Sequence, residues 1–189
     1  MEAVRDDQCS AAQKKFGEWL KKMELVKPSL KYQESFIEAM KEFQAEEKKT
    51  GLDVFDLEQD FGKYIKKFED HEKGVNLPEG YVPHTRLWLV ENGKFVGHVD
   101  IRHTLNEELL THGGLIGYSI RPTERNKGYG TKILAMALPI AKKFGNKRIL
   151  VTCDDDNLGS IKIIEKSGGV LENKVPFAGK LKRRYWISI

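Results

Sequence analysis

The chain has 189 residues, of which 40% are hydrophobic and 32% charged, and its formal net charge is +4. This composition is typical of a globular domain, and no apolar run approaches the roughly 20 residues that a membrane span requires. Basic and acidic residues are interspersed, which argues against a nucleic-acid partner, and the two cysteines form neither a disulfide framework nor a metal motif. The polar N-terminus carries no secretory signal, so we expect a cytoplasmic protein without membrane contact.

Residues 1–22 differ in pattern from the rest of the chain. Ala12, Phe16, Trp19 and Leu20 recur at helical spacing between pairs of lysines. Two interpretations stay open: an amphipathic helix that packs on the main body, or an extension ahead of a natural start at Met23. We assign no function to this segment and expect the folded domain to span residues 23–189.

The next part of the chain predicts helices and then strands. Apolar residues on one face predict a helix over 30–49, and a shorter helix is expected over 57–71, followed by a loop at 74–83. Strands are expected over 86–90 and 94–102, joined at Asn92-Gly93, which is a strong hairpin signal. A polar loop over 106–112 then leads to an apolar strand at 115–120.

The second half alternates helices and strands. A helix is predicted over 127–144, with Pro139 expected to kink it or mark its last turns, and a short strand over 148–152. Asp156 or Asn157 is expected to cap a helix over 157–167, and strands are expected at 170–175 and 184–189. This order predicts an α/β or α+β fold, with a sheet flanked by helices.

The most informative stretch is Arg125-Asn126-Lys127-Gly128-Tyr129-Gly130-Thr131, which lies between the strand at 115–120 and the following helix. Backbone N–H groups at such a strand-to-helix turn point at a bound anion, and the helix dipole adds to the attraction. Glycines at 128 and 130 permit close approach because they lack a Cβ atom. The turn therefore predicts a site for a phosphate or pyrophosphate.

Three linked motifs resemble the GNAT superfamily of acyl-CoA-dependent N-acyltransferases. Arg125-x-x-Gly128-x-Gly130 is similar to its pyrophosphate loop, and Asn157-x-x-Ser160 with Ile164-Glu165-Lys166-x-Gly168 is similar to its following helix, at the expected spacing. The segments Arg102-His103-x-Leu105-Asn106 and Gly113-Gly114-Leu115-Ile116-Gly117-Tyr118 further resemble a subgroup of uncharacterised predicted acetyltransferases. The resemblance covers roughly residues 24–189.

This resemblance implies a mixed, mostly antiparallel twisted sheet flanked by helices, and acetyl-CoA as co-substrate without a metal. The residues that it implies for cofactor binding are Ser119, Ile120, Arg125, Asn126, Lys127, Gly128, Tyr129, Gly130, Thr131, Asn157 and Ser160. Asn157 and Ser160 have a second interpretation as a helix cap and a small helix-face residue. The acidic run 154–156 is more typical of helix capping than of a metal site.

The chain departs from the family pattern in two places. Ile164 stands where many members carry the tyrosine proposed to protonate the departing thiolate, and Gly169 replaces the usual aromatic residue at the helix exit. Tyr118 and Tyr185 are candidates to supply that proton instead, with water as a further source. Each tyrosine can equally be a core residue on a strand.

The implied reaction also requires a neutral amine. At pH 7, deprotonation costs about 4.6 kcal/mol for a lysine-like amine but only about 1 kcal/mol for an α-amine. His103, at a strand end beside a polar loop, is the first candidate for the base, and Asp100 and Glu108 follow. A structural hydrogen bond at a strand end is the alternative role of His103.

We therefore expect an enzyme that transfers acetyl directly from acetyl-CoA to a primary amine of a small molecule. A protein or peptide N-acetyltransferase and a non-catalytic acyl-CoA-binding module are the alternatives, and a homodimer stays open. A P-loop nucleotide-binding protein is disfavoured because the turn lacks the Gly-x-x-x-x-Gly-Lys-Ser/Thr spacing.

Overall fold

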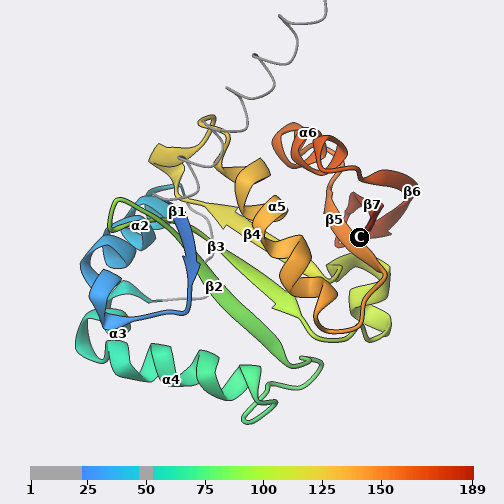
Figure 1. Ribbon diagram of the computed structural model, residues 1–189. Coiled ribbons are helices and arrows are strands. Elements are labelled where there is room, and N and C mark those ends of the chain that lie inside the picture. Colours follow the sequence, from blue (N-terminus) through green and yellow to red (C-terminus); the bar gives the residue numbers. More distant parts are fainter. Residues whose placement is uncertain (1–22, 47–52) are drawn as a thin grey trace, which may run out of the picture.

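The computed structural model describes residues 23–46 and 53–189 (Figure 1), so the interpretations of residues 1–22 lie outside the described residues. The described elements are, in chain order, β1 (Met23–Val26), η1 (Leu30–Tyr32), α2 (Gln33–Ala45), α3 (Val54–Gln59), α4 (Phe61–Glu72), β2 (His84–Glu91), β3 (Lys94–Arg102), η2 (Leu109–Gly113), β4 (Ile116–Ile120), η3 (Pro122–Glu124), α5 (Tyr129–Lys142), β5 (Arg148–Asp154), α6 (Leu158–Lys166), β6 (Val170–Phe177) and β7 (Lys180–Ser188). None of these helices combines the length and the apolar character that crossing a bilayer demands.

The strands form two antiparallel sheets, with the orders β1-β2-β3-β4 and β5-β7-β6. The predicted hairpin between β2 and β3 is confirmed, and both Asn92 and Gly93 have positive φ angles, of 51° and 77°. The predicted α/β class with a mostly antiparallel sheet flanked by helices is also confirmed, with the strands divided between two sheets.

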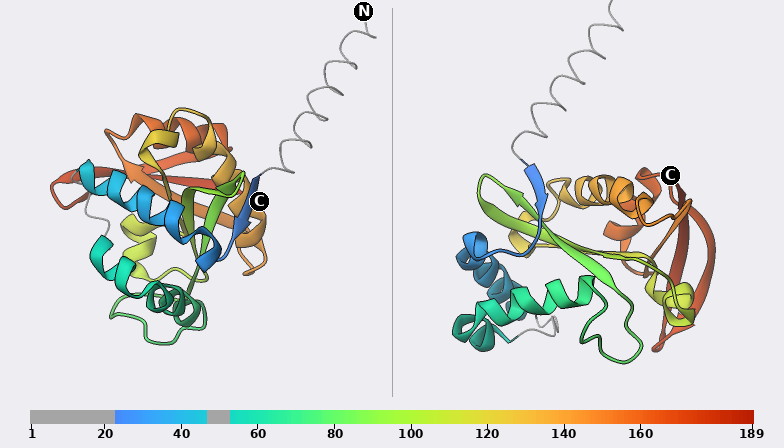
Figure 2. Two further views of the ribbon diagram at one scale, coloured as in Figure 1. Left: turned by 90° about the vertical axis from the view of Figure 1, so that its left-hand side faces the viewer. Right: turned by 60° about the horizontal axis from the view of Figure 1, so that its bottom comes forward.

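Helices cover the first sheet on both faces (Figure 2). On one face, α2, α3 and α4 bury an aromatic core in which Phe36 stacks on Trp88 at 4.5 Å. On the other face, α5 and α6 bury an aliphatic core that includes Val99, Ile133 and Ile164. The alternating side chains of β3 therefore face two different environments, which decides where its polar residues lie.

The two sheets meet where β4 and β5, each the edge strand of its sheet, come together. The Leu115 N–H donates to the Leu150 carbonyl at 2.7 Å, and no ladder joins β4 to β5 within residues 23–46 and 53–189. Gly114 permits this contact, since its φ is +71° and a Cβ atom there would lie 2.9 Å from the same carbonyl. The outer backbone edge of β4 is consequently left without a partner strand.

Several predicted boundaries were wrong for local reasons. The helix expected over 57–71 is two helices, because Asp53 and Asp60 each cap a new start through bonds to Phe55 N and Lys63 N. The loop expected over 106–112 contains the π-helical turn η2, which the Asn106 side chain begins by accepting from Leu109 N at 2.9 Å.

The last strand also begins earlier than predicted, at Lys180 rather than at residue 184. Its first residues are basic and lack strand alternation, but they pair with the acidic run that ends β5. Lys182 binds Asp154 at 2.6 Å, and Arg183 binds Asp155 at 2.5 Å. The acidic run 154–156 thus anchors the β6–β7 hairpin, and of the two predicted caps for α6 it is Asn157 that caps the helix.

Candidate functional site

The turn between β4 and α5 has an open helix N-terminus. Gly128 is the N-cap residue of α5 with a φ of +81°, and no side chain caps this helix. A Cβ atom at Gly128 would have no described atom within 4 Å. Side chains cap α3, α4 and α6, whereas α2, which continues directly from η1, and α5 have none, so the first-turn N–H groups of α5 are free for an anion.

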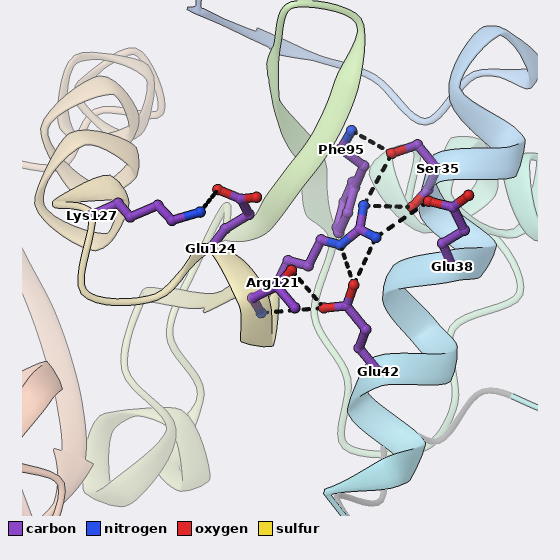
Figure 3. A network of polar contacts seen from close by, with 8 residues as sticks. Ser35, Glu38, Glu42, Phe95, Arg121, Glu124 and Lys127 are labelled. Carbon is purple, nitrogen blue, oxygen red and sulfur yellow. Dashed lines mark hydrogen bonds and ion pairs between the residues drawn. The ribbon is translucent and has the colours of Figure 1, made fainter.

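The side chains of this turn are directed elsewhere. The Arg125 guanidinium binds Glu46 at 2.7 Å and the Ile120 carbonyl at 3.3 Å, and it lies over the Phe43 ring. Lys127 pairs with Glu124 at 2.9 Å (Figure 3). Anion binding at this turn would therefore rest on backbone amides rather than on these two predicted cations.

Tyr129 and Gly130 of the motif have packing roles. The Tyr129 ring is buried, and its hydroxyl donates to Glu91. Gly130 packs against Ile163 of α6, and a Cβ atom there would overlap the end of the Ile163 side chain, so this glycine allows close packing of α5 on α6. Asn126, exposed with a φ of +62°, and half-buried Thr131 complete the turn.

An acidic face of α2 holds the chain just before the turn (Figure 3). Arg121 is bound by Glu42 at 2.7 Å and by Glu38 at 3.3 Å. Glu42 also accepts from the Thr123 backbone N–H and hydroxyl, at 3.2 and 2.9 Å. Burial opposes ionisation of Glu42, but these bonds outweigh it and lower its pKa. This clamp, defined by Glu38, Glu42, Arg121 and Thr123, fixes η3 against α2.

Tyr118 lies on the α5–α6 face of β4. Its hydroxyl is buried and has no hydrogen-bond partner among the described residues. Burial raises the pKa of Tyr118 to about 12, although the Ser160 hydroxyl nearby partly opposes this. Cys153 is also near, and burial raises the pKa of its thiol to about 11, which keeps it protonated and unreactive. An orphaned hydroxyl beside the unpaired edge of β4 fits a site that a ligand completes.

Tyr185 is fully buried and already bonded. Its hydroxyl donates to Glu165 at 3.1 Å and accepts from Arg183 at 3.4 Å. Ile164, at the position of the family tyrosine, is fully buried in the aliphatic core. The departure at Gly169 has a local cause, because its N–H closes the helix end on the Ile164 carbonyl and a Cβ atom would lie 2.8 Å from that oxygen.

Asn157 acts as the N-cap of α6, and its side chain accepts from Ser160 N at 3.0 Å. Ser119 and Ile120 end β4, with Ser119 directly opposite His98 of β3. Of the residues implied for cofactor contact, Ser119, Ile120 and the turn follow one another along a single continuous segment. Asn157 and Ser160 instead belong to the N-cap and first turn of α6.

A cavity of about 520 Å³ lies beside α4, on the face of β3 that points away from α5 and α6. It is lined by Lys67, Phe68, His71, Pro78, Glu79, Gly80, Tyr81, Val82, His84, Arg86, Asp100, Arg102, Glu108, Leu109 and Gly113. Asp100 is the register partner of Gly117 in β4, which connects the cavity wall to the strand that leads to the turn.

Two candidate bases are held in structural bonds. Asp100 forms a bidentate ion pair with Arg86, at 2.7 and 2.5 Å. Burial alone would raise its pKa, but Arg86 outweighs burial and holds the pKa of Asp100 well below its usual range. His103 bonds to Thr85 at 2.9 Å and stacks on Phe144, at the far end of α5 from the turn. Glu108 is exposed at the cavity.

Sequence reasoning did not assign His98 or Arg86 to the site. His98 lies on the same face of β3 as Asp100, and burial with the charge of Arg86 lowers its pKa to about 4. Strand alternation is the signal that could have placed His98 on the face of Asp100, but the partner Arg86 lies across the β2–β3 ladder. Throughout the described part of the chain, no cluster of three or more His, Cys, Asp or Glu side chains could hold a metal ion.

Comparisons with solved structures show the same fold at low identity. The microcin C7 self-immunity acetyltransferase MccE, solved with acetyl-CoA and AMP, is 18% identical with a TM-score of 0.65, over 89% of this chain and 93% of that one. RimJ from Mycobacterium smegmatis, with CoA-disulfide, is 16% identical with a TM-score of 0.67, over 88% and 81%. The ribosomal L7/L12 α-N-protein acetyltransferase RimL is 14% identical with a TM-score of 0.64, over 89% and 94%.

A search of curated protein sequences finds no match. The family model described as acetyltransferase (GNAT) family matches residues 39–169, which contain α5, α6, the turn between β4 and α5, and most of the cavity wall. Since the match spans well over half of the 189 residues, this chain belongs to the GNAT family of acetyltransferases.

Proposed function

We propose that this protein transfers the acetyl group of acetyl-CoA directly to a primary amine of a small molecule. The observation that carries the proposal is the uncapped N-terminus of α5 at Gly128, which adjoins the unpaired edge of β4. The amides of the turn fit a pyrophosphate, and acetyl-CoA supplies the thioester. The cavity of about 520 Å³ on the neighbouring face supports a small acceptor.

In the proposed reaction, the amine nitrogen bonds to the acetyl carbon, the carbon–sulfur bond breaks, and the sulfur leaves as a thiol. The backbone N–H groups on the outer edge of β4 are available to stabilise negative charge on the acetyl oxygen, a contribution of a few kcal/mol in comparable sites. This chain therefore contributes mainly by positioning the two substrates.

Two proton transfers remain. Glu108 is exposed at the cavity, where its Oε1 atom lies 3.3 Å from His112 Nε2 and it has no buried arginine partner of the kind that holds Asp100, so we assign it the proton of the amine. Tyr118 is the candidate acid, because its hydroxyl is unbonded and a pKa of about 12 keeps it protonated at neutral pH. Tyr185, by contrast, already donates to Glu165.

Thiol release from acetyl-CoA, followed with a panel of small amines, tests the proposal. We expect turnover with at least one amine and none without an acceptor. Transfer of labelled acetyl only to proteins in a lysate would indicate the protein N-acetyltransferase alternative. Binding of CoA with no turnover on either kind of acceptor would indicate a non-catalytic module.

A further inference from the structure

The segment that joins β3 to β4 forms one wall of the cavity. Arg102 Nη1 donates to the carbonyls of Gly113 and Gly114, at 3.2 and 3.0 Å. Asn106 donates to the Gly80 carbonyl at 2.8 Å, which ties η2 to the loop over 78–82. The family resemblance in this segment assigned no role to these residues, yet Arg102 and Asn106 hold the wall of a cavity together.

Arg102 brings to this wall a guanidinium without an ion pair in the described part of the chain. It is only partly exposed, its bonds go to neutral carbonyls, and it forms no ion pair with any residue in the described ranges. Arg86, the other arginine of the cavity, is instead neutralised by Asp100. Burial lowers the pKa of Arg102, and the nearby charges of Asp100 and Glu108 oppose this shift only in part.

His71 and Lys67 of α4 line the same cavity. His71 is only 3% exposed, and its Nδ1 atom has no hydrogen-bond partner among the described residues. Buried polar atoms without partners are uncommon, and a ligand is one of the groups that satisfies them. The exposed Lys67 side chain has its ammonium 5.8 Å from the centre of the Phe68 ring, which also lines the cavity.

The acidic groups of the cavity come from a different part of its wall. Glu79 belongs to the loop after α4, and Glu108 immediately precedes η2, where its Oε2 atom would lie 3.6 Å from a Cβ atom at Gly80. Both are exposed. Within the described residues, the cavity thus has one partly buried cation without an ion-pair partner, Arg102, a buried neutral imidazole at His71, an exposed lysine at Lys67, and an acidic rim.

We propose that the acceptor is a primary amine that also carries an anionic group, a carboxylate or a phosphate, which Arg102 and His71 bind with help from Lys67. Glu108 at the rim then faces the amine. This inference rests on the proposed function for the identity of the pocket as the acceptor site, but anion binding itself can be measured without acetyl transfer.

The test is calorimetric binding, with and without CoA, of two matched probe pairs: 4-aminobutyrate against 4-aminobutyramide, and 2-aminoethyl phosphate against ethanolamine. We expect at least one acidic probe to bind about tenfold or more tightly than its neutral partner, since a charge-assisted bond is lost in the latter. The pair with the larger ratio distinguishes carboxylate from phosphate. Equal affinities within both pairs would overturn the proposal.

Variants locate the binding. Arg102→Gln should weaken binding of the preferred acidic probe about tenfold to hundredfold, and Lys67→Gln, which removes an exposed side chain and should not affect folding, about two- to fivefold. Lys63→Gln on the same helix, outside this cavity, is the matched control and should change nothing. If Lys67→Gln and a folded Arg102→Gln both bind like the unsubstituted protein, the assignment is wrong.

The two proposals fail differently. Preference for acidic probes that depends on Arg102, without turnover, would retain the anion site and remove the proposed function. Turnover that is indifferent to the acidic group and to Arg102 would retain the acetyltransferase and remove the anionic acceptor.

Discussion

The turn at the start of α5 and the cavity beneath α4 are built in opposite ways. The turn consists of one continuous segment whose amides face open space, and its important property is the absence of a capping side chain at Gly128. The cavity brings together α4, β2, β3 and η2, and its properties come from pairs such as Arg86–Asp100. In the proposed assignment, backbone groups that local sequence positions would bind the cofactor, whereas side chains that distant contacts position would bind the acceptor.

The two regions are nevertheless linked through α2. Its acidic face holds Arg121 ahead of the turn (Figure 3). Its aromatic face stacks Phe36 on Trp88 in the core that supports α4. A change in one region is expected to reach the other only through this helix or through β3 and β4. Substitutions in each region test how separate the two are.

The largest effect is expected at the turn itself. Gly128→Glu should weaken CoA binding more than a hundredfold, because the variant places a carboxylate where the amides attract an anion. Gly145→Glu is a matched control, since Gly145 has a φ of +85° and equally open surroundings at the other end of α5. Calorimetric titration with CoA measures both, and equal affinities would remove the turn from the binding site.

In the cavity wall, Asp100→Asn should lower the free energy of unfolding by about 3 kcal/mol, because it leaves Arg86 buried without its carboxylate. Glu58→Gln breaks the exposed pair with Lys41 and should cost less than about 1 kcal/mol. The double variant Arg86→Met with Asp100→Leu should recover much of the loss. Urea unfolding checks all three, and a loss at Asp100 no larger than at Glu58 would contradict a buried pair.

His98, on the same face of β3 as Asp100, predicts a pH dependence of the free energy of unfolding. Its folded-state pKa of about 4 lies below an unfolded value of ~6.5, so the unfolded chain binds the proton more readily. Stability from this group is complete above pH ~6.5 and declines by up to about 3 kcal/mol as the pH falls to 4. His98→Gln should flatten this part of the curve of unfolding free energy against pH. Parallel curves for the two proteins would contradict the prediction.

Tyr118→Phe separates catalysis from packing. Because the hydroxyl has no partner, its removal should leave the free energy of unfolding within about 1 kcal/mol. If it donates a proton to the leaving sulfur, kcat should fall about a hundredfold. Tyr185→Phe is the control, since it breaks bonds to Glu165 and Arg183 and should affect stability more than turnover. An unchanged kcat in Tyr118→Phe would assign the proton to water.

The smallest effect is expected in the clamp. Glu42→Gln keeps an acceptor for Thr123 but removes the charge facing Arg121, so KM for acetyl-CoA should rise about two- to fivefold with little change in KM for the amine. Glu38→Gln, on a side chain 66% exposed, should have less effect. An equal rise for both substrates would show that the clamp stabilises the whole fold rather than the turn.

These contrasts explain which expectations the sequence supported. The hairpin at Asn92-Gly93 and the glycine at the start of α5 follow from backbone conformations that a few neighbouring residues determine. The preference for His103 as base rested on its place at a strand end, but the hydrogen bond to Thr85 and the stacking on Phe144 determine the orientation of its imidazole ring. No local pattern reveals a partner 18 residues away across a sheet.

The order of elements and the position of the glycine turn at the start of α5 were therefore determined by the sequence, because hydrophobic periodicity and glycine conformation act over a few residues. Only the tertiary structure decided that Arg125 turns toward Glu46, that Tyr118 keeps an unbonded hydroxyl, and that Arg102 lacks the carboxylate that Arg86 has. The physical reason is that burial and pairing set the behaviour of a charged or polar group, and both arise only when distant segments pack together.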